Sequence, residues 1–265
     1  TLEDLSYYTI DNLPCSLINT LIDQFSENDD RLTEKIAIGI DARNNNHDLS
    51  FLPDTLQSLT DKQIPAELVF IEASDDVLTK RFSETRRKHP LSSESVALTD
   101  AIKQERSMIR EISEAADLRI DSSHMQLHEL REIVRERIAK REKGALSLQI
   151  ISFGYKNGIP KDADFVFDLR CLPNPYWNKN LRPFSGKDAV IIEFLSKQDS
   201  VKQMLSDLQH FLDRWVPTFE ADNRSYLSIA LGCTGGHHRS VFIAEQLAGF
   251  FKEHNKQIIL RHRDI

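Results

Sequence analysis

The feature that most constrains the fold is a glycine-rich turn between an apolar run and an amphipathic run near the end of the chain. Ser228–Leu231 is apolar enough for a central strand, and Ser240–Phe250 continues as a helix with its small and apolar side chains on one face. The nine residues Gly232–Ser240 read Gly-Cys-Thr-Gly-Gly-His-His-Arg-Ser. A strand, a tight turn and a helix in this order predict an α/β fold.

The turn has the properties of an anion-binding loop. Its three glycines permit unusual backbone angles and close approach of a ligand, while the helix N-terminus offers free amide groups and the positive end of the helix dipole. Arg239 is placed to hold an anion with a two-pronged hydrogen bond. Only one of His237 and His238 can point at such a ligand. A purely structural turn is the simpler alternative.

An enzymatic alternative comes from the spacing of Cys233 and Arg239. Cys-x5-Arg followed by Ser240 is the pattern of protein tyrosine phosphatases, in which a thiolate of low pKa attacks phosphorus. Gly232 stands where the usual His precedes the nucleophile, and no Trp-Pro-Asp segment supplies a general acid. We therefore favour simple anion binding and keep the phosphatase as its rival.

Composition restricts the class of protein. The 265 residues are 40% hydrophobic and contain no apolar run long enough to cross a bilayer, so we expect a soluble protein with one large or two ordinary cores. The three cysteines, Cys15, Cys171 and Cys233, are odd in number and far apart, which favours a reducing, cytoplasmic setting without disulfides or a zinc site.

Charge is distributed unevenly along the chain. The net charge of −7 argues against nonspecific coating of nucleic acid. Residues 1–144 carry 19 Lys and Arg against 28 Asp and Glu (19 − 28 = −9), and residues 145–265 carry 15 against 13 (15 − 13 = +2). We expect any RNA partner to contact the second part.

Alternating β-rich and amphipathic runs predict βα units around parallel sheets, with a domain boundary near Gly144. The expected strands are residues 7–10, 36–41, 68–73, 118–120, 146–153, 165–169, 226–231 and 257–260. The expected helices are residues 16–25, 75–88, 99–116, 125–141, 201–215 and 238–254. Residues 172–186, which hold three prolines and Tyr176-Trp177, are expected to form a long ordered loop.

Seven ordered motifs run through nearly the whole chain. They are Asp11–Pro14, Asp41–Asn44, Thr85–Leu91, Ser152–Gly158, Phe167–Pro175, Asn223–Tyr226 and the glycine-rich turn. Together they resemble the RNase adapter protein family, RapZ. The resemblance implies a P-loop kinase-like nucleotide-binding domain over residues 1–144 and an α/β domain that binds RNA and a sugar phosphate over residues 145–265.

The resemblance also implies ligands and partners. The family's regulators bind ATP or GTP and glucosamine-6-phosphate, present a small regulatory RNA to an RNase E-like endoribonuclease, and assemble as homo-oligomers described as tetramers. They control amino-sugar synthesis, and a two-component sensor or regulator is a further expected partner. A weak ATPase or GTPase activity of the complete protein is the second enzymatic alternative.

Carried onto this sequence, the family's sites fall on three groups of residues. The sugar phosphate would contact Asp168, Arg170, Thr234, Gly235, Gly236, His238 and Arg239. RNA would contact Lys156, Asn157, Tyr176 and Arg239, and the nucleotide would contact Asp41, Ala42, Arg43 and Asn44. A salt bridge between Asp168 and Arg170 is the alternative role for that pair. Arg81, Arg86 and Arg87 resemble a nucleotide-kinase lid, or form a solvated face.

The sequence departs from the family at several places. The phosphate-cradling Gly-x-x-x-x-Gly-Lys-Ser would precede Thr1, so the chain as given is expected to lack the first strand and to bind ATP or GTP poorly. Asn157 and Tyr176 stand where the family pattern has His, and the sequence as given reaches Ile265 without the run of Lys and Arg that closes many relatives. We therefore expect sugar-phosphate binding more firmly than RNA binding.

Overall fold

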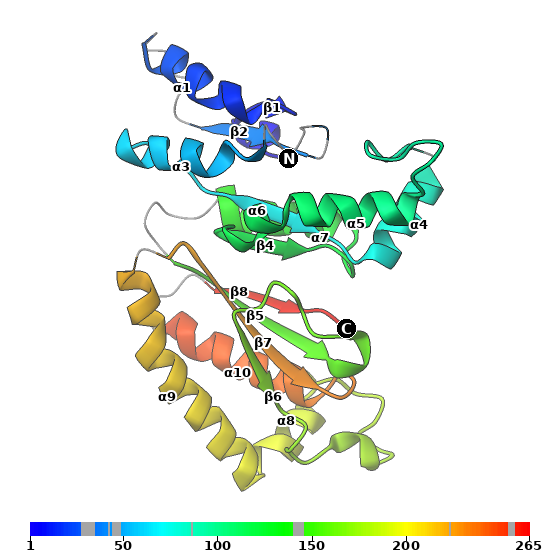
Figure 1. Ribbon diagram of the computed structural model, residues 1–265. Coiled ribbons are helices and arrows are strands. Elements are labelled where there is room, and N and C mark those ends of the chain that lie inside the picture. The colour runs from blue at the N-terminus through cyan, green and yellow to red at the C-terminus, as the bar shows by residue number, and fades with distance from the viewer. Residues whose placement is uncertain are drawn as a thin grey trace. The chain divides into compact units, whose positions relative to one another are not determined.

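The structure is a computed structural model that describes residues 1–27, 35–41, 43, 49–85, 87–139, 146–222, 224–253 and 258–265. The chain divides into two compact units, Thr1–Arg135 and Glu136–Ile265 (Figure 1). The boundary expected near Gly144 lies outside the described residues.

Unit 1 contains two pairs of parallel strands. β1 (Tyr8–Asp11) pairs with β2 (Ile36–Gly39), and β3 (Val69–Glu72) pairs with β4 (Leu118–Asp121). The described helices are η1 (Glu3–Leu5), η2 (Cys15–Leu17), α1 (Ile18–Glu27), α3 (Leu52–Asp61), α4 (Asp75–Thr85), α5 (Leu98–Met108), α6 (Arg110–Glu114) and α7 (Leu127–Val134). The parallel pairing confirms the predicted α/β class.

Three helices of unit 1 differ from the expectation. α3 was not expected from the pattern, although Leu52, Thr55 and Leu59 recur at helical spacing and are buried. The helix expected over residues 99–116 is interrupted at Ile109, whose φ of −98° and ψ of 8° lie outside the helical range, so α5 and α6 are separate. The helix expected over residues 125–141 begins with a capping box at Gln126 and turns after Val134 into a π-helix, η4 (Arg135–Ala139).

Unit 2 is built on one four-stranded parallel sheet with the order β6-β7-β5-β8 (Figure 1). Its strands are β5 (Ser147–Gly154), β6 (Phe165–Asp168), β7 (Tyr226–Cys233) and β8 (Ile258–His262). Its helices are η5 (Tyr155–Asn157), η6 (Pro175–Trp177), α8 (Ala189–Ser196), α9 (Asp199–Ala221) and α10 (Arg239–Glu253). All eight residues of β5 and all eight of β7 are buried, which agrees with the continuous apolar runs of these segments.

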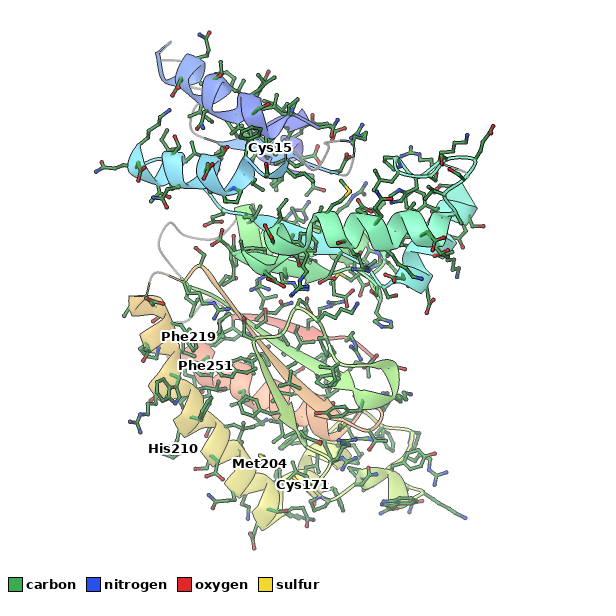
Figure 2. All side chains as sticks on the ribbon, in the orientation of Figure 1. Cys15, Cys171, Met204, His210, Phe219 and Phe251 are labelled. Atoms are coloured by element: carbon green, nitrogen blue, oxygen red, sulfur yellow. The ribbon has the colours of Figure 1, made fainter. Side chains whose placement is uncertain are left out.

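The core of unit 2 lies between the sheet and α8, α9 and α10. Leu148 and Ile150 of β5 and Ile229 of β7 pack there with Phe219 of α9 and Phe251 of α10, the last two of which are labelled in Figure 2. α8 was not expected, because its Val-Ile-Ile run resembles a strand as much as a helix. α9 continues past the expected end at residue 215 and includes Pro217.

In the described part of the chain, no helix combines the length and apolar character that a bilayer crossing requires.

Candidate anion-binding site

The glycine-rich turn lies at the carboxyl end of β7, between a buried strand and the first turn of α10. The register places Asp168 of β6 opposite Gly232, and Gly154 of β5 opposite Cys233. Three segments that are distant in sequence therefore meet at one edge of the sheet: residues 154–158, residues 168–172 and the turn itself. Open α/β sheets bind ligands at this edge, so the fold positions the turn where a ligand site is expected.

Arg239 connects the turn to the segment after β6. Its guanidinium is buried, and Nη1 donates to the carbonyl oxygens of Arg170 at 2.9 Å and Leu172 at 3.0 Å. Nη2 donates to Thr234 Oγ1 at 3.3 Å. Nε is buried and has no partner among the described residues. Nη1 is thus occupied by the protein backbone. The Nε and Nη2 groups of the guanidinium remain able to donate to a ligand.

The two histidines have different surroundings. His238 is buried, and its ring interacts with the backbone carbonyls of Arg182 and Phe184. Burial and the neighbouring His237 lower the pKa of His238 below its ordinary value, so the neutral ring is favoured at neutral pH. Its Nε2 is buried and unpartnered within the described residues. His237 is only partly buried and meets His238 edge-on.

Close backbone approach explains two of the glycines. A Cβ added to Gly154 would lie 2.5 Å from the carbonyl carbon of Gly235 and 2.7 Å from the backbone nitrogen of Gly236. Gly236 itself has a φ of 74°, a conformation that favours glycine. The segment after β5 and the turn after β7 therefore touch through their backbones, with no room for a side chain between them.

Asp168 and Arg170 form the salt bridge that was the alternative role for this pair. Arg170 Nη2 donates to Asp168 Oδ2 at 2.6 Å, and Nε donates to both carboxylate oxygens at 3.0 Å. The hydrogen bonds from Arg170 hold the pKa of Asp168 below its usual value. Both side chains are about half exposed, and Arg170 also covers the Tyr155 ring at 4.0 Å. A ligand can therefore still reach either group from solvent.

The residues assigned to RNA lie on two loops. Lys156 donates its backbone N–H to the carbonyl oxygen of Thr234 at 3.2 Å, which joins its loop to the turn. Asn157 Nδ2 donates to Asp264 Oδ1 at 2.7 Å. Tyr176 is 47% exposed and belongs to the long loop after β6. The structure brings Lys156 and Asn157 to the edge that carries the turn.

Asp264 and Arg263 are site residues that the sequence did not reveal. Asp264 Oδ2 accepts the backbone N–H of Gly154 at 2.6 Å, and Arg263 Nη2 donates to the carbonyl oxygens of Gly154 and Gly158 at 3.1 and 2.7 Å. They follow β8 directly and fix the loop that contains Lys156. No motif marks them, because their role depends on β8 lying beside β5.

The long loop after β6 is fixed at both ends by the turn. Arg239 holds its beginning through the carbonyl of Leu172. At its end, Gly186 donates its N–H to the carbonyl oxygen of His237 at 2.9 Å, and His238 contacts the carbonyls of Arg182 and Phe184. Cys171, labelled in Figure 2, is exposed at the beginning of this loop. The expected ordered loop is thus organised by residues 237–239.

Cys233 is almost inaccessible, with 2% of the residue exposed. Burial raises the pKa of its thiol, but hydrogen bonds with Ser240 and Gly236 and the charge of Arg239 outweigh burial and leave the pKa below its ordinary value. Its Sγ lies 3.2 Å from Ser240 Oγ. The thiol therefore supports the start of α10 from the protein side of the turn.

The nucleotide residues of unit 1 are described only in part, because Ala42 and Asn44 lie outside the described residues. Asp41 accepts hydrogen bonds from the backbone N–H of Arg43 at 2.8 Å and from its guanidinium at 2.7–3.0 Å, which lowers the pKa of Asp41. Arg43 Nη2 also reaches Asp11 at 3.4 Å. The donors of Arg43 already occupy the Asp41 carboxylate, so a nucleotide would have to share or displace them.

The arginines that resemble a nucleotide-kinase lid have different surroundings. Arg81 donates through Nη1 to Ser122 Oγ at 3.0 Å and through Nη2 to the Ser122 carbonyl at 2.7 Å, so it is anchored after β4. Arg87 is exposed, and Arg86 lies outside the described residues. Among the described residues, no three His, Cys, Asp or Glu side chains come together as a metal site.

Comparison with known proteins covers both units. The RapZ-like N-terminal domain matches residues 1–142, and the RapZ C-terminal domain matches residues 146–265. The chain belongs to the RapZ family. RapZ family relatives over the whole chain include proteins of Alcanivorax borkumensis (48% identical over 264 residues, 93% of that protein) and Nitrosococcus oceani (47% over 264 residues, 92%). A Cellvibrio japonicus protein is 46% identical over 264 residues, 89% of its length. Each is named a nucleotide-binding protein.

Proposed function

We propose that this RapZ family protein is a non-catalytic regulator that senses glucosamine-6-phosphate in unit 2 and binds RNA with the same face. The observation that carries the proposal is the turn at the start of α10, where the Nε–H of Arg239 is a buried donor without a partner in the described structure. Buried donors are nearly always paired in native proteins. A phosphate at a helix N-terminus supplies acceptor oxygens for such donors.

The chemistry of the site fits an amino-sugar phosphate. The phosphate would lie against the backbone N–H groups of the turn, Thr234 Oγ1 and Arg239 Nε, where the dipole of α10 favours negative charge. Asp168, whose lowered pKa keeps it ionised, would attract the ammonium group of the sugar. The exposed Asp168–Arg170 pair then lies on the side of the site opposite the phosphate and determines the selectivity between sugars.

RNA binding is proposed for the adjacent loops. Lys156 and Asn157 lie on a segment that contacts the turn through backbone atoms, so one ligand at the turn affects the position of both. Because Arg239 belongs to both proposed contact sets, we expect the sugar phosphate and RNA to compete. The regulator would release a small regulatory RNA to an RNase E-like endoribonuclease, or withhold it, according to the sugar-phosphate concentration. A two-component sensor or regulator and a homotetrameric assembly complete this proposal.

A nucleotide site is proposed for unit 1. The relatives are named nucleotide-binding proteins, and Asp41 at the carboxyl side of β2 has a carboxylate suited to accept N–H groups of a guanine base. ATP or GTP is the expected ligand. Asp41→Asn should then weaken guanine nucleotides more than adenine nucleotides, as measured by fluorescence with labelled GTP and ATP.

Calorimetry with purified protein tests the sugar-phosphate proposal. The parent should bind glucosamine-6-phosphate, bind glucose-6-phosphate more weakly and fail to bind glucosamine, because the phosphate is the main anchor. Thr234→Val removes an exposed hydroxyl and should reduce the affinity several-fold. Thr218→Val, at an exposed position of α9, is its control and should leave the affinity unchanged. Equal affinities for the sugar phosphate and for glucosamine would contradict the proposal.

The rival phosphatase requires Cys233 to attack phosphorus. We propose instead that the buried thiol supports the turn. Cys233→Ser should retain glucosamine-6-phosphate binding, and neither form should release phosphate from an aryl phosphate. Release by the parent that is lost in Cys233→Ser would establish the enzyme.

A further inference from the structure

The long loop after β6 has an unusual charge and aromatic content for this chain. Residues 169–187 contain four basic side chains and no Asp or Glu, although the whole chain has a net charge of −7. The aromatic residues Tyr176, Trp177 and Phe184 are interspersed with them, and all three are exposed. A basic, aromatic surface on an acidic protein indicates a partner that carries negative charge and flat rings.

Trp177 is the most conspicuous of these side chains. It is 78% exposed, more than any other large apolar residue in the described part of the chain. Asn178, Lys179 and Asn180 follow it and are also exposed. A protein–protein interface would need a wider apolar area around the indole. A single projecting ring with polar and cationic neighbours is better suited to one flat partner.

The loop holds this indole in a defined position. Asn174 accepts the backbone N–H groups of Tyr176, on its side chain at 3.3 Å, and of Trp177, on its carbonyl at 3.3 Å. Arg182 donates to the carbonyl of Tyr176 at 3.2 Å and covers the Tyr176 ring at 4.3 Å. Tyr176 meets Trp177 nearly edge-on, at 76°. The two rings are therefore not stacked on each other, and the indole stays largely exposed while the backbone beneath it is fixed.

We propose that Trp177 is a stacking platform for an unpaired base of single-stranded RNA, with Lys179 and Arg182 contacting the neighbouring phosphates. This inference rests on the proposed RNA function and assigns it a contact that recognises bases. Aromatic side chains in a basic setting bind single strands in this way, because every base has a π-face. Residues 237–239 fix both ends of the loop, so the platform belongs to the same site as the anion-binding turn.

Binding of full-chain variants to a labelled single-stranded RNA of about twelve nucleotides tests the platform. Trp177→Ala should weaken binding about tenfold, and Trp177→Phe should retain most of the affinity because a ring is still present. The salt dependence should be unchanged in Trp177→Ala but its slope should fall by about one in Lys179→Ala. Trp215→Ala is the matched control, since Trp215 is also exposed and lies beside an arginine, Arg214.

Fluorescence supplies a second measurement that does not depend on affinity. The chain has two tryptophans, so Trp215→Phe leaves Trp177 as the single tryptophan. Saturating RNA should quench its emission, and an RNA that is abasic throughout should not. The stacking role of Trp177 would be wrong if Trp177→Ala bound RNA as tightly as the parent, or if saturating RNA left the emission of Trp177 unquenched. Neither result would contradict RNA binding itself. A parent chain that binds no RNA would contradict the proposed RNA function itself. A change in sedimentation of Trp177→Ala without RNA would assign the indole to contacts between copies instead.

Discussion

At the scale of single residues, Arg239 is the centre of the site because it acts on both the protein and the proposed ligand. Its Nη1 donates to two carbonyl oxygens of the segment after β6, while Nε has no partner in the described structure. The residue cannot be removed without leaving those carbonyls unpaired. A loss of ligand binding in Arg239→Ala alone would therefore not separate the two roles.

Urea denaturation distinguishes the structural role of Arg239. Arg239→Ala should lower the free energy of unfolding by about 1–3 kcal/mol, since the carbonyls of Arg170 and Leu172, one part-buried and one buried, lose their donor. Arg214→Ala, on an exposed part of α9, should change it by less than about 0.5 kcal/mol. If the two variants are equally stable, the anchoring role of Arg239 is wrong.

His262 predicts a pH dependence of stability. Its Nδ1 lies 2.8 Å from Ser152 Oγ and its Nε2 lies 3.1 Å from Glu245 Oε1, with Lys187 nearby. Burial lowers the pKa of His262, and Glu245 only partly opposes this effect. As the pH falls, His262 therefore takes up its proton in the unfolded chain before it does so in the folded chain. The contribution of neutral His262 to stability is fully present above the ordinary histidine pKa of about 6.5, and it is lost as the pH falls below that value.

Unfolding titrations across pH 5–8, an interval of about 1.5 units on either side of the ordinary histidine pKa, test this sign. The parent should lose stability toward low pH, with His262 contributing at most about 1.4 kcal/mol per pH unit. His262→Gln should show a shallower loss, with the remaining slope due to other buried histidines such as His238. A steeper loss in the variant would refute the assignment.

The sequence predicted the important residue types of the site but not their contacts. Gly236 and Arg239 were found because a strand, glycines and a helix occur in one continuous segment. The bonds from Arg239 to Arg170 and Leu172 join residues about seventy positions apart, and no local pattern records them. Asp264 was missed for the same reason, since its contact with Gly154 depends on the pairing of β8 with β5.

At the scale of elements, the close approach of two loops is the most easily broken feature. Gly154→Ala would place a Cβ within 2.8 Å of three backbone atoms of Gly235 and Gly236, which cannot move aside like a side chain. We expect it to lower the free energy of unfolding by about 1–3 kcal/mol, the usual cost of overpacking. It should also abolish glucosamine-6-phosphate binding.

Gly249→Ala is the matched control for this substitution. A Cβ at Gly249 meets nothing within 4 Å, and in the middle of α10 alanine is the better helix former. Calorimetry and thermal unfolding should therefore find unchanged binding and equal or greater stability. Normal ligand affinity in Gly154→Ala would show that the two loops do not form one site.

The predictable elements are those with an unambiguous period. β5, β7 and α10 were expected near their observed bounds because their apolar runs are long and bordered by turn residues. α8 was missed because Ala-Val-Ile-Ile favours strand and helix alike, and its packing on the core decides for helix. α9 was expected to end at residue 215, but buried Val216 and the packing of Phe219 hold its final turns together, with Pro217 inside the helix.

At the scale of the whole molecule, Arg137 determines where a stable fragment of unit 2 should begin. Although it precedes the matched C-terminal domain, its side chain is buried in unit 2, where Nη1 donates to Gln149 Oε1 at 2.6 Å and Ser228 Oγ at 3.0 Å. Burial lowers its pKa to about 10, so the guanidinium remains charged at neutral pH. It also covers the Tyr226 ring at 5.2 Å.

Two fragments test this contribution. Residues 136–265 should unfold at a higher temperature than residues 146–265, because the shorter fragment loses Arg137 and exposes Tyr226 and Gln149. Arg137→Met in the longer fragment removes the charge and its hydrogen bonds but keeps a long side chain over Tyr226, so it separates the two effects. Equal melting temperatures for the two fragments would show that unit 2 does not need the segment before β5.

The proposed functions of unit 2 depend on an anion bound at the start of α10. A crystal structure of the protein soaked with phosphate tests this claim most directly. We predict density for one phosphate against the backbone N–H groups of residues 235–239, within hydrogen-bonding distance of Arg239 Nε and Thr234 Oγ1. Phosphate bound elsewhere with this turn empty would contradict the proposed anion site.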